Sequence, residues 1–221
     1  MKKERYFAPE TLRAKSRSML DSVRELRARR PDLAFQPARA ALLVLDMQDY
    51  FLRPASHAFV PSAAAILPNV QALINVFDAH RRPVIFTRHL NSEEDAAGMG
   101  RWWRDLIRAD SPDSRIAFLL DPGPTPVIIR KSQYDAFHAS PLEQTLRDLE
   151  VEQVVITGVM THLCCETTAR AAFVRGFDVF FVVDGTATYT EAFHRASLLN
   201  LAHGFAVPVL AEEILEDVSD A

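Results

Sequence analysis

The sequence predicts a single, doubly wound α/β domain with a six-stranded, mainly parallel sheet flanked by helices. Two observations support this prediction. Six short apolar runs alternate with segments of helical periodicity, which is the order expected for a parallel sheet covered on both faces. At 221 residues, 48% of them hydrophobic, the chain is long enough to bury one full core, and we find no repeat or linker that would divide it.

Residues 1–36 are expected to form an amphipathic helix ahead of the main domain, which covers residues 37–221. Pro9 suits the first turn of a helix, and Pro31 ends the pattern because proline cannot continue a helix. We expect this helix to pack on the body of the protein or on a partner subunit. Its apolar residues recur at roughly helical spacing: Leu12, Met19, Leu20, Val23 and Leu26.

Strands and helices alternate through the main domain. Residues 90–126 interrupt this order with a polar loop, a short helix at Trp102-Trp103 and a segment rich in proline and glycine. The expected strands are Ala40–Leu45, Pro83–Thr87, Val127–Arg130, Val154–Val159, Asp178–Val183 and Phe205–Leu210. The expected helices are Ala63–His80, Pro141–Leu149, a helix that opens near Cys164 and includes Thr167–Phe173, then Thr190–Ala202 and residues 211–218.

Composition excludes several classes of function. The formal net charge is −4 with interleaved signs, so nothing favours nucleic acid or an anionic membrane as a partner. No apolar run approaches the ~20 residues of a membrane span, and the opening MKKERYFAPE lacks the apolar core of a signal peptide. The two cysteines are adjacent and cannot build a disulfide framework. We therefore expect a cytoplasmic protein that acts on a small molecule.

Three chemically active side chains follow three of the expected strands. Asp46, Lys131 and Cys164 provide a carboxylate, a cation and a thiol, and His89 and Asp184 follow two other strands. Because ligands of open α/β sheets bind at the carboxyl ends of the strands, we expect the first three to converge. A position near the first turn of a helix favours the thiolate, so we expect the pKa of Cys164 to be lowered and its sulfur to be nucleophilic. Asp46 would take its proton and later return it to a leaving group, while Lys131 stabilises both charges.

Each of these residues also has an ordinary structural interpretation. A carboxylate after a strand is often a cap, and a lysine there is often solvated. The combination of both with a cysteine at the opening of a helix is what favours catalysis.

Three segments resemble the isochorismatase-like cysteine hydrolase superfamily: LLVLDMQDYF, VIIRKSQYDAF and TGVMTHLCCETTARAA. That superfamily includes nicotinamidases, N-carbamoylsarcosine amidohydrolase and isochorismatases, and the resemblance covers roughly residues 36–212. It implies an Asp46–Lys131–Cys164 triad. It also implies a cis peptide bond between Val159 and Met160 that orients the backbone amides of an oxyanion hole in the turn carrying Cys164.

Several further side chains are expected at the substrate pocket, each with ordinary packing as the alternative. Substrate contacts should come mainly from residues 52–62 and 90–125, where Trp102 and Trp103 are candidates for a lid or a subunit contact. In the same segment, Arg101 and Arg104 are candidates for binding a substrate carboxylate. The expected substrate-binding residues are Gln48, Phe51, His89, Tyr134, Phe137 and His162.

The resemblance leaves the reaction open. The segments around Asp46 and Tyr134, together with His162, are most similar to the isochorismatase branch, which hydrolyses a vinyl ether with water and has a small residue in place of Cys164. Retention of Cys164 favours covalent cleavage of an amide or carbamoyl-type C–N bond. The alternatives are isochorismate hydrolysis with Asp46 as the acid, or a non-catalytic redox-sensing or binding module that uses the Cys164–Cys165 pair.

No cofactor or metal is expected. Nicotinamidases bind a metal through a D-x-H motif after the second strand, whereas this chain has Thr87-Arg88-His89 there, so the aspartate ligand is missing. One histidine alone makes a poor zinc site. A homodimer or homotetramer is expected, because the N-terminal helix and the tryptophan-bearing insertion offer additional apolar surface and the family resemblance points the same way.

Overall fold

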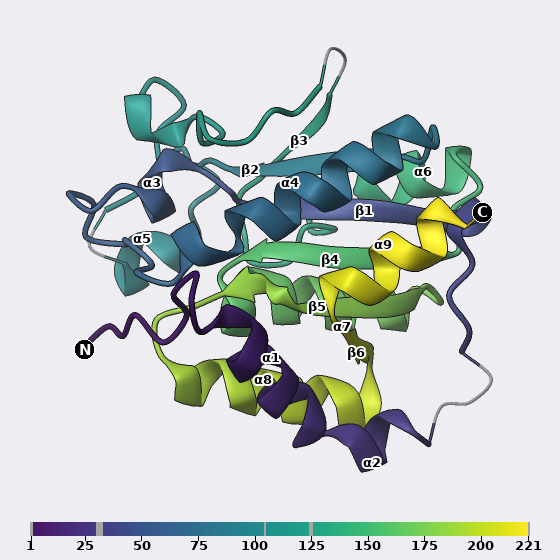
Figure 1. The fold of residues 1–221 in the computed structure, drawn as a ribbon. Helices are drawn as coiled ribbons and strands as arrows, with labels where there is room; N and C mark the ends of the chain where they lie inside the picture. Colours follow the sequence, from purple (N-terminus) through teal and green to yellow (C-terminus); the bar gives the residue numbers. More distant parts are fainter. Residues whose placement is uncertain (1, 30–32, 104, 124–125, 221) are drawn as a thin grey trace.

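The computed structural model describes residues 2–29, 33–103, 105–123 and 126–220. Six strands form one sheet in the order β3-β2-β1-β4-β5-β6, and every neighbouring pair is parallel (Figure 1). The α/β fold class expected from the sequence is therefore confirmed. The strands are β1 (Ala40–Leu45), β2 (Val84–His89), β3 (Val127–Lys131), β4 (Gln153–Val159), β5 (Asp178–Ala187) and β6 (Val207–Val209).

Helices cover both faces of the sheet. α4 (Ala63–Ala79) and α9 (Ala211–Ser219) lie side by side on one face, and α7 (Glu166–Val174) lies on the other (Figure 1). The remaining α-helices are α1 (Leu12–Asp21), α2 (Arg24–Arg27), α3 (Asp49–Leu52), α5 (Met99–Trp102), α6 (Leu142–Asp148) and α8 (Glu191–Gly204). None of the helices in the described part of the chain has the length and apolar character of a membrane span.

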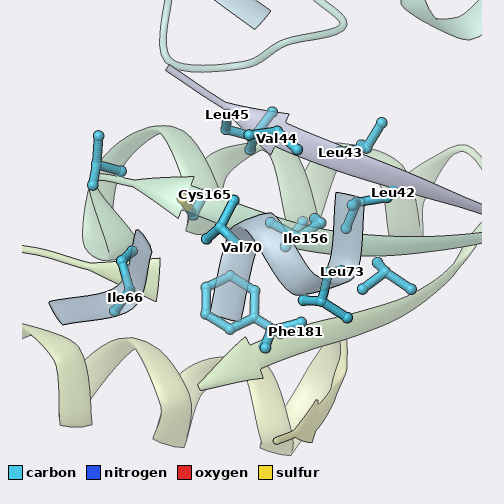
Figure 2. Close-up of a cluster of buried hydrophobic side chains, with 14 of the residues drawn as sticks. Leu42, Leu43, Val44, Leu45, Ile66, Val70, Leu73, Ile156, Cys165 and Phe181 are labelled. Atoms are coloured by element: carbon cyan, nitrogen blue, oxygen red, sulfur yellow. The ribbon is translucent and has the colours of Figure 1, made fainter. Parts of the chain in front are cut away.

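The core lies between the sheet and its helices. All six residues of β1 are buried, as are all seven of β4, because both faces of these central strands are covered. Side chains of Leu42, Ile66 and Val70 are inaccessible to solvent and pack together (Figure 2). Cys165 lies in the same cluster, fully buried. Its burial agrees with a packing role rather than an exposed redox role.

The N-terminal region is not the single helix that we expected. It contains the short helices α1 and α2, broken at Ser22-Val23, and Pro31 lies outside the described residues. Phe7 and Met19 are fully buried and belong to the same hydrophobic core as the sheet. This region therefore packs on the body of the protein.

Two other local elements depart from the sequence patterns. β5 continues to Ala187, past the expected end at Val183, because residues 184–187 remain buried and Thr186 and Ala187 still pair with β4. A π-helical turn, Thr161–Cys165, separates β4 from α7. Cys164 thus lies in this turn and not at the first turn of α7.

The order of the strands changes direction between β1 and β4. From β1 the chain adds β2 and β3 on one side of the sheet, and from β4 it adds β5 and β6 on the other. In open α/β folds, such a switch point leaves a crevice beyond the carboxyl ends of the strands. Leu45 pairs with Gly158 near the ends of β1 and β4, and His89 pairs with Lys131 at the ends of β2 and β3, so the carboxyl ends of these four strands lie at the same edge of the sheet. The residues that follow these strands therefore meet at one edge.

Candidate active site

Asp46 follows β1 directly and is held by the neighbouring strand. Its φ of 52° lies in the left-handed region, which turns the chain sharply at the end of the strand. The Thr87 hydroxyl of β2 donates to Asp46 Oδ1 at 2.7 Å and accepts from the Asp46 amide at 3.1 Å. The carboxylate is inaccessible to solvent. One threonine thereby fixes both the backbone and the side chain of Asp46.

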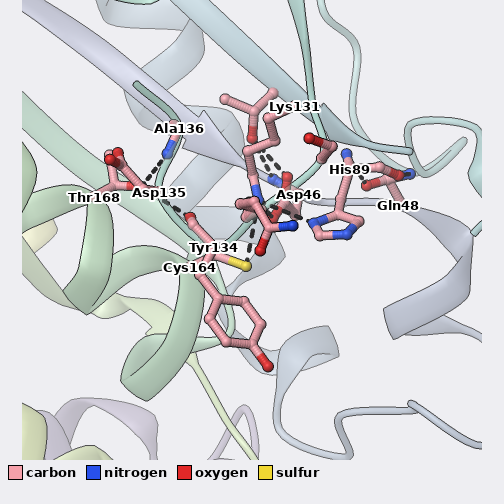
Figure 3. Close-up of polar contacts among 12 residues, drawn as sticks. Asp46, Gln48, His89, Lys131, Tyr134, Asp135, Ala136, Cys164 and Thr168 are labelled. Atoms are coloured by element: carbon pink, nitrogen blue, oxygen red, sulfur yellow. Dashed lines mark hydrogen bonds and ion pairs between the residues drawn. The ribbon is translucent and has the colours of Figure 1, made fainter. Parts of the chain in front are cut away.

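Lys131, the last residue of β3, places its ammonium group at the centre of the site (Figure 3). Its Nζ lies 2.7 Å from Asp46 Oδ2, 3.4 Å from Cys164 Sγ, 3.2 Å from His89 Nδ1 and 2.8 Å from the Gln133 carbonyl oxygen. The side chain is fully buried. A buried charge is tolerated only when it is paired and hydrogen-bonded, and this ammonium group meets both conditions.

Before the turn that carries Cys164, β4 passes very close to β1. Gly158 of β4 has a φ of +114°, and a Cβ there would lie 2.0 Å from the Leu45 carbonyl oxygen, so only glycine fits. Shortly after Gly158, the peptide bond between Val159 and Met160 is cis, as the resemblance implies. The π-helical turn then carries Cys164, whose side chain is buried beside Lys131 and Asp46.

The protonation states of the three groups follow from burial and mutual charge. Burial is the largest single influence on the pKa of Asp46 and raises it, but the charge of Lys131 and smaller contributions from its other neighbours together bring the net pKa below the usual value. Burial is likewise the largest single influence on the pKa of Lys131 and lowers it, but Asp46 and Cys164 together leave the pKa above the usual value. Asp46 is thus a carboxylate and Lys131 an ammonium ion at neutral pH.

Cys164 is a thiol at rest, which corrects our expectation of a thiolate. Burial raises its pKa to about 12, and the carboxylate of Asp46 adds to this effect while Lys131 opposes it. Cys164 lies in the π-helical turn that runs directly into α7, so it is near a helix N-terminus as expected, but burial is the dominant influence on its pKa. The thiol therefore needs a base, and a carboxylate oxygen of Asp46 lies within 4.8 Å of its sulfur.

His89 completes the polar end of the site as a neutral side chain. Burial lowers its pKa to about 4, with a further contribution from the charge of Lys131. Its Nδ1 faces the Lys131 ammonium group, so the tautomer that fits its partners carries the proton on Nε2, which donates to Asn91 Oδ1 at 2.9 Å.

Gln48 was expected to bind substrate, but its side chain does not line the cavity. Its side-chain amide accepts from the His89 backbone N–H at 2.8 Å and donates to the backbone carbonyl oxygens of His89 and Ser114 at 3.1 and 2.8 Å. The residue is fully buried, and these three bonds engage its amide. Gln48 therefore positions the end of β2 and the segment at Ser114.

A cavity of about 450 Å³, counted out to its open mouth, leads from Cys164 to the surface. This size suits a small molecule. Of the expected substrate-binding residues, Phe51, His89 and Tyr134 line it. Thr168 of α7 positions Tyr134, because its hydroxyl donates to the Tyr134 carbonyl oxygen at 3.3 Å and accepts from the Ala136 amide at 3.1 Å (Figure 3).

Two other expected pocket residues lie elsewhere. Phe137 is buried and stacks on Phe177 with ring centroids 6.0 Å apart. His162 stacks on Phe193 of α8 at 4.3 Å, and its Nδ1 lies 2.5 Å from the Thr188 hydroxyl. Neither lines the cavity, so the structure assigns both to packing.

The sequence patterns missed most of the cavity wall. Trp103 lines the cavity, whereas Trp102 is 79% exposed and Arg101 is exposed outside it; Arg104 lies outside the described residues. Met160, expected in the oxyanion-hole turn, lines the cavity. The other lining residues come mainly from the two segments expected to supply contacts, but they were not singled out individually: Tyr50, His57, Ala58, Asn91, Met99, Asp105, Leu106, Ile107 and Tyr189.

The cluster of potential metal ligands is already filled by a cation. Asp46, His89 and Cys164 each offer a ligand atom within 4.8 Å of the others. The Lys131 ammonium group lies among these atoms, 2.7 to 3.4 Å from each. Since its charge would repel a metal ion and its position would block one, these residues as arranged do not fit a metal site.

Comparisons with known proteins agree with this geometry. The chain is 41% identical over 180 residues to nicotinamidase 3 of Arabidopsis thaliana, which covers 79% of this chain and 86% of that protein. It is 36% identical over 186 residues to enterobactin synthase component B of Escherichia coli (strain K12), which covers 83% of this chain and 65% of that protein. A cysteine hydrolase from Pseudomonas syringae pv. phaseolicola 1448A shares the fold with a TM-score of 0.81 and 27% identity, over 84% of this chain and 95% of that one.

The family model named isochorismatase domain matches residues 40–213, most of the chain. This match confirms the resemblance drawn from the three motifs and favours an enzyme over a non-catalytic sensor or binding module. The chain therefore belongs to the isochorismatase family and is a hydrolase of that family.

Proposed function

We propose that this hydrolase cleaves a small amide or carbamoyl-type C–N bond through a covalent intermediate on Cys164. The observation that carries the proposal is the placement of one buried ammonium group, Lys131, within 2.7 Å of the Asp46 carboxylate and 3.4 Å of the Cys164 thiol. A base, a cation and a nucleophile at the closed end of a small-molecule cavity are the parts that thiol-dependent acyl transfer requires.

In the first half-reaction, Cys164 Sγ bonds to the substrate carbonyl carbon as its proton passes to the Asp46 carboxylate. The carbonyl π electrons move to oxygen and form an oxyanion. Asp46 then gives the proton to the substrate nitrogen, the C–N bond breaks, and ammonia or an amine leaves a thioester on Cys164. Lys131 stays protonated throughout and offsets first the carboxylate and then the negative charge that develops on sulfur.

In the second half-reaction, a water molecule attacks the thioester carbonyl as Asp46 takes one of its protons. The second tetrahedral intermediate collapses, and the C–S bond breaks. The proton returns to sulfur, so the acid product departs and the thiol is restored. Asp46 therefore serves as base and acid in turn, which suits a carboxylate that is ionised at rest.

We expect the backbone amides of Met160 and Cys164 to donate hydrogen bonds to the oxyanion. The amides of Leu163 and Cys165, which share this turn, donate to the Met160 carbonyl oxygen at 3.0 and 3.2 Å and are engaged. Both Met160 and Cys164 line the cavity. Backbone N–H groups fixed in a buried turn stabilise a developing negative charge without having to reorganise.

The protonation states favour this reaction over isochorismate hydrolysis. Protonation of a vinyl ether requires Asp46 to begin the cycle as an acid, but Lys131 holds its pKa below the usual value. The carboxylate and thiol present at rest are instead a base and a nucleophile. The 41% identity to a nicotinamidase further supports an amide as the substrate.

The test compares Cys164→Ala with Cys165→Ala on isochorismate, nicotinamide, carbamoyl compounds and simple amides. Cys165→Ala is the matched control, because it removes the adjacent thiol, which lies in the core. We expect intact-protein mass spectrometry to detect an acyl adduct in wild type and Cys165→Ala, with release of ammonia or an amine. Both signals should be lost in Cys164→Ala. Isochorismate turnover that survives in Cys164→Ala would overturn the proposal.

A further inference from the structure

Three polar side chains form a connected group at the open end of the cavity. We call Tyr50, His57 and Asp105 the mouth cluster. The Tyr50 hydroxyl donates to Asp105 Oδ1 and lies 3.3 Å from His57 Nε2, and His57 Nδ1 lies 3.4 Å from the same carboxylate oxygen. All three line the cavity that Cys164 closes at its buried end. The Asp105 side chain is 53% exposed, which places it at the entrance.

The mouth cluster gives the entrance a negative character. Among the described residues that line the cavity, none is lysine or arginine. Within the described part of the chain, the basic side chain that contacts Asp105 is His57, which forms an ion pair only when it is protonated, and the Lys131 ammonium group is engaged by Asp46. A carboxylate at the mouth of a cavity attracts cations and N–H donors and repels a second carboxylate.

The wall between the thiol and Asp105 is aromatic and apolar. Phe51, Trp103, Tyr134 and Tyr189 line it, and Trp103 Nε1 donates to the Tyr134 hydroxyl at 2.7 Å. This hydrogen bond holds two of the rings in place. Flat aromatic surfaces bind a planar or apolar body and leave the ends of the substrate to polar groups.

We propose that Asp105 is a specificity-determining residue, which selects amides that carry a cationic or N–H donor group at the end remote from the scissile carbonyl. The carbonyl would face Cys164, the body of the substrate would lie against the aromatic wall, and the donor group would face Asp105. Tyr50 positions the carboxylate through its hydroxyl. This inference rests on the proposed amidase function.

The experiment uses three probes with one ring: benzamide, 4-(aminomethyl)benzamide and 4-carbamoylbenzoate. They are neutral, cationic and anionic at pH 7. We expect wild type to have its highest kcat/KM for the cationic amide and its lowest for the anionic one. In Asp105→Asn, the value for the cationic amide should fall and that for the anionic amide should rise, each by roughly three- to tenfold from the loss of one nearby charge. Asp105→Glu should retain the wild-type order.

Opposite changes for the two charged probes separate recognition from structural damage, since a disturbed loop would lower all three values together. Asp110→Asn is the matched control, because Asp110 is an exposed acid of the same segment that does not line the cavity. It should leave the order unchanged. Protection of Cys164 from iodoacetamide by the same probes measures binding and serves where turnover is slow.

Two outcomes would overturn the inference while leaving the proposed function intact. In the first, the Cys164 adduct forms but Asp105→Asn changes all three probes by one factor. In the second, wild type prefers 4-carbamoylbenzoate, which would support carboxylate binding by arginines of the 101–104 segment. If no amide gives an adduct on Cys164, the proposed function fails. Equal protection of Cys164 from iodoacetamide by the three probes would overturn the role of Asp105 by itself.

Discussion

The two ends of the cavity are built in different ways. At the buried end, Asp46 and Lys131 follow or end strands of one sheet, are inaccessible to solvent and form an ion pair. At the open end, Tyr50 comes from a four-residue helix, while His57 and Asp105 come from loops and are partly exposed. A strand edge fixes positions through many backbone hydrogen bonds, whereas a loop is fixed by a few side-chain contacts.

This difference indicates that the two ends of the cavity have different roles. The buried end holds charges where solvent screening is weak, so a single missing partner is costly both for folding and for chemistry. The open end holds its groups partly in solvent, where each contact contributes less to stability. We therefore expect changes at the buried end to act on the reaction and on stability, and changes at the mouth to act on substrate choice.

The largest contrast is expected between two adjacent residues of β3. Lys131→Met leaves the buried carboxylate of Asp46 without its cation, so activity should be lost and the free energy of unfolding should fall by about 3–5 kcal/mol. Arg130→Met is the matched control, because Arg130 pairs with Asp95 on the surface, and it should change the free energy of unfolding by less than about 1 kcal/mol. Urea denaturation and amide turnover measure both effects.

A double variant sharpens this contrast. Asp46→Asn combined with Lys131→Met removes both charges, so the protein should be more stable than Lys131→Met alone, although inactive. Equal destabilisation by Arg130→Met and Lys131→Met would show that burial does not distinguish the two ion pairs.

A smaller effect is expected from His89 when the pH falls. Its pKa in the folded protein is about 4, below the usual value of 6.5 for histidine. Between these values the unfolded chain binds a proton that the folded protein does not, so stability is complete above pH 6.5 and is lost as the pH falls towards 4. The difference between pH 7 and pH 5 amounts to about 2 kcal/mol for this one residue.

His89→Gln should remove that part of the pH dependence. The measurement is the free energy of unfolding in urea at pH 7 and pH 5 for wild type and variant. His80→Gln controls for the loss of a histidine as such, because His80 is exposed. An unchanged loss of stability on acidification in His89→Gln would contradict a buried, neutral His89.

The contrast between strand ends and loops also explains which site residues could be predicted from the sequence. Asp46, Lys131 and Cys164 lie at or just beyond strand ends, and their convergence followed from the parallel order of the strands, although periodicity placed the end of β5 four residues too early. The thiolate was predicted wrongly because the pKa of Cys164 depends on burial in three dimensions, which no local pattern reports. Gln48, Phe137 and His162 lie near the motifs in sequence, but their side chains point into other contacts.

The cavity wall could be predicted only as two segments. Tyr50, His57 and Asp105 are separated by up to 55 residues, and their hydrogen bonds depend on how two irregular loops lie against each other. Loop conformation has no periodic signal in sequence. The tryptophan pair illustrates the limit, because the sequence marks both residues equally while the structure uses one in the cavity.

That pair provides the smallest and most local test of the comparison. Trp103→Phe removes the Nε1–H that donates to the Tyr134 hydroxyl, so one wall of the cavity loses its fixed position while Asp46, Lys131 and Cys164 are untouched. The KM for an amide substrate should rise about fivefold, as expected for a net loss of about 1 kcal/mol, and kcat should change little. Trp102→Phe, at the exposed neighbour, should change neither. A fall in kcat without a change in KM in Trp103→Phe would mean that the mouth acts on the reaction itself, and a smaller assembly for Trp102→Phe in light scattering would make Trp102 a subunit contact.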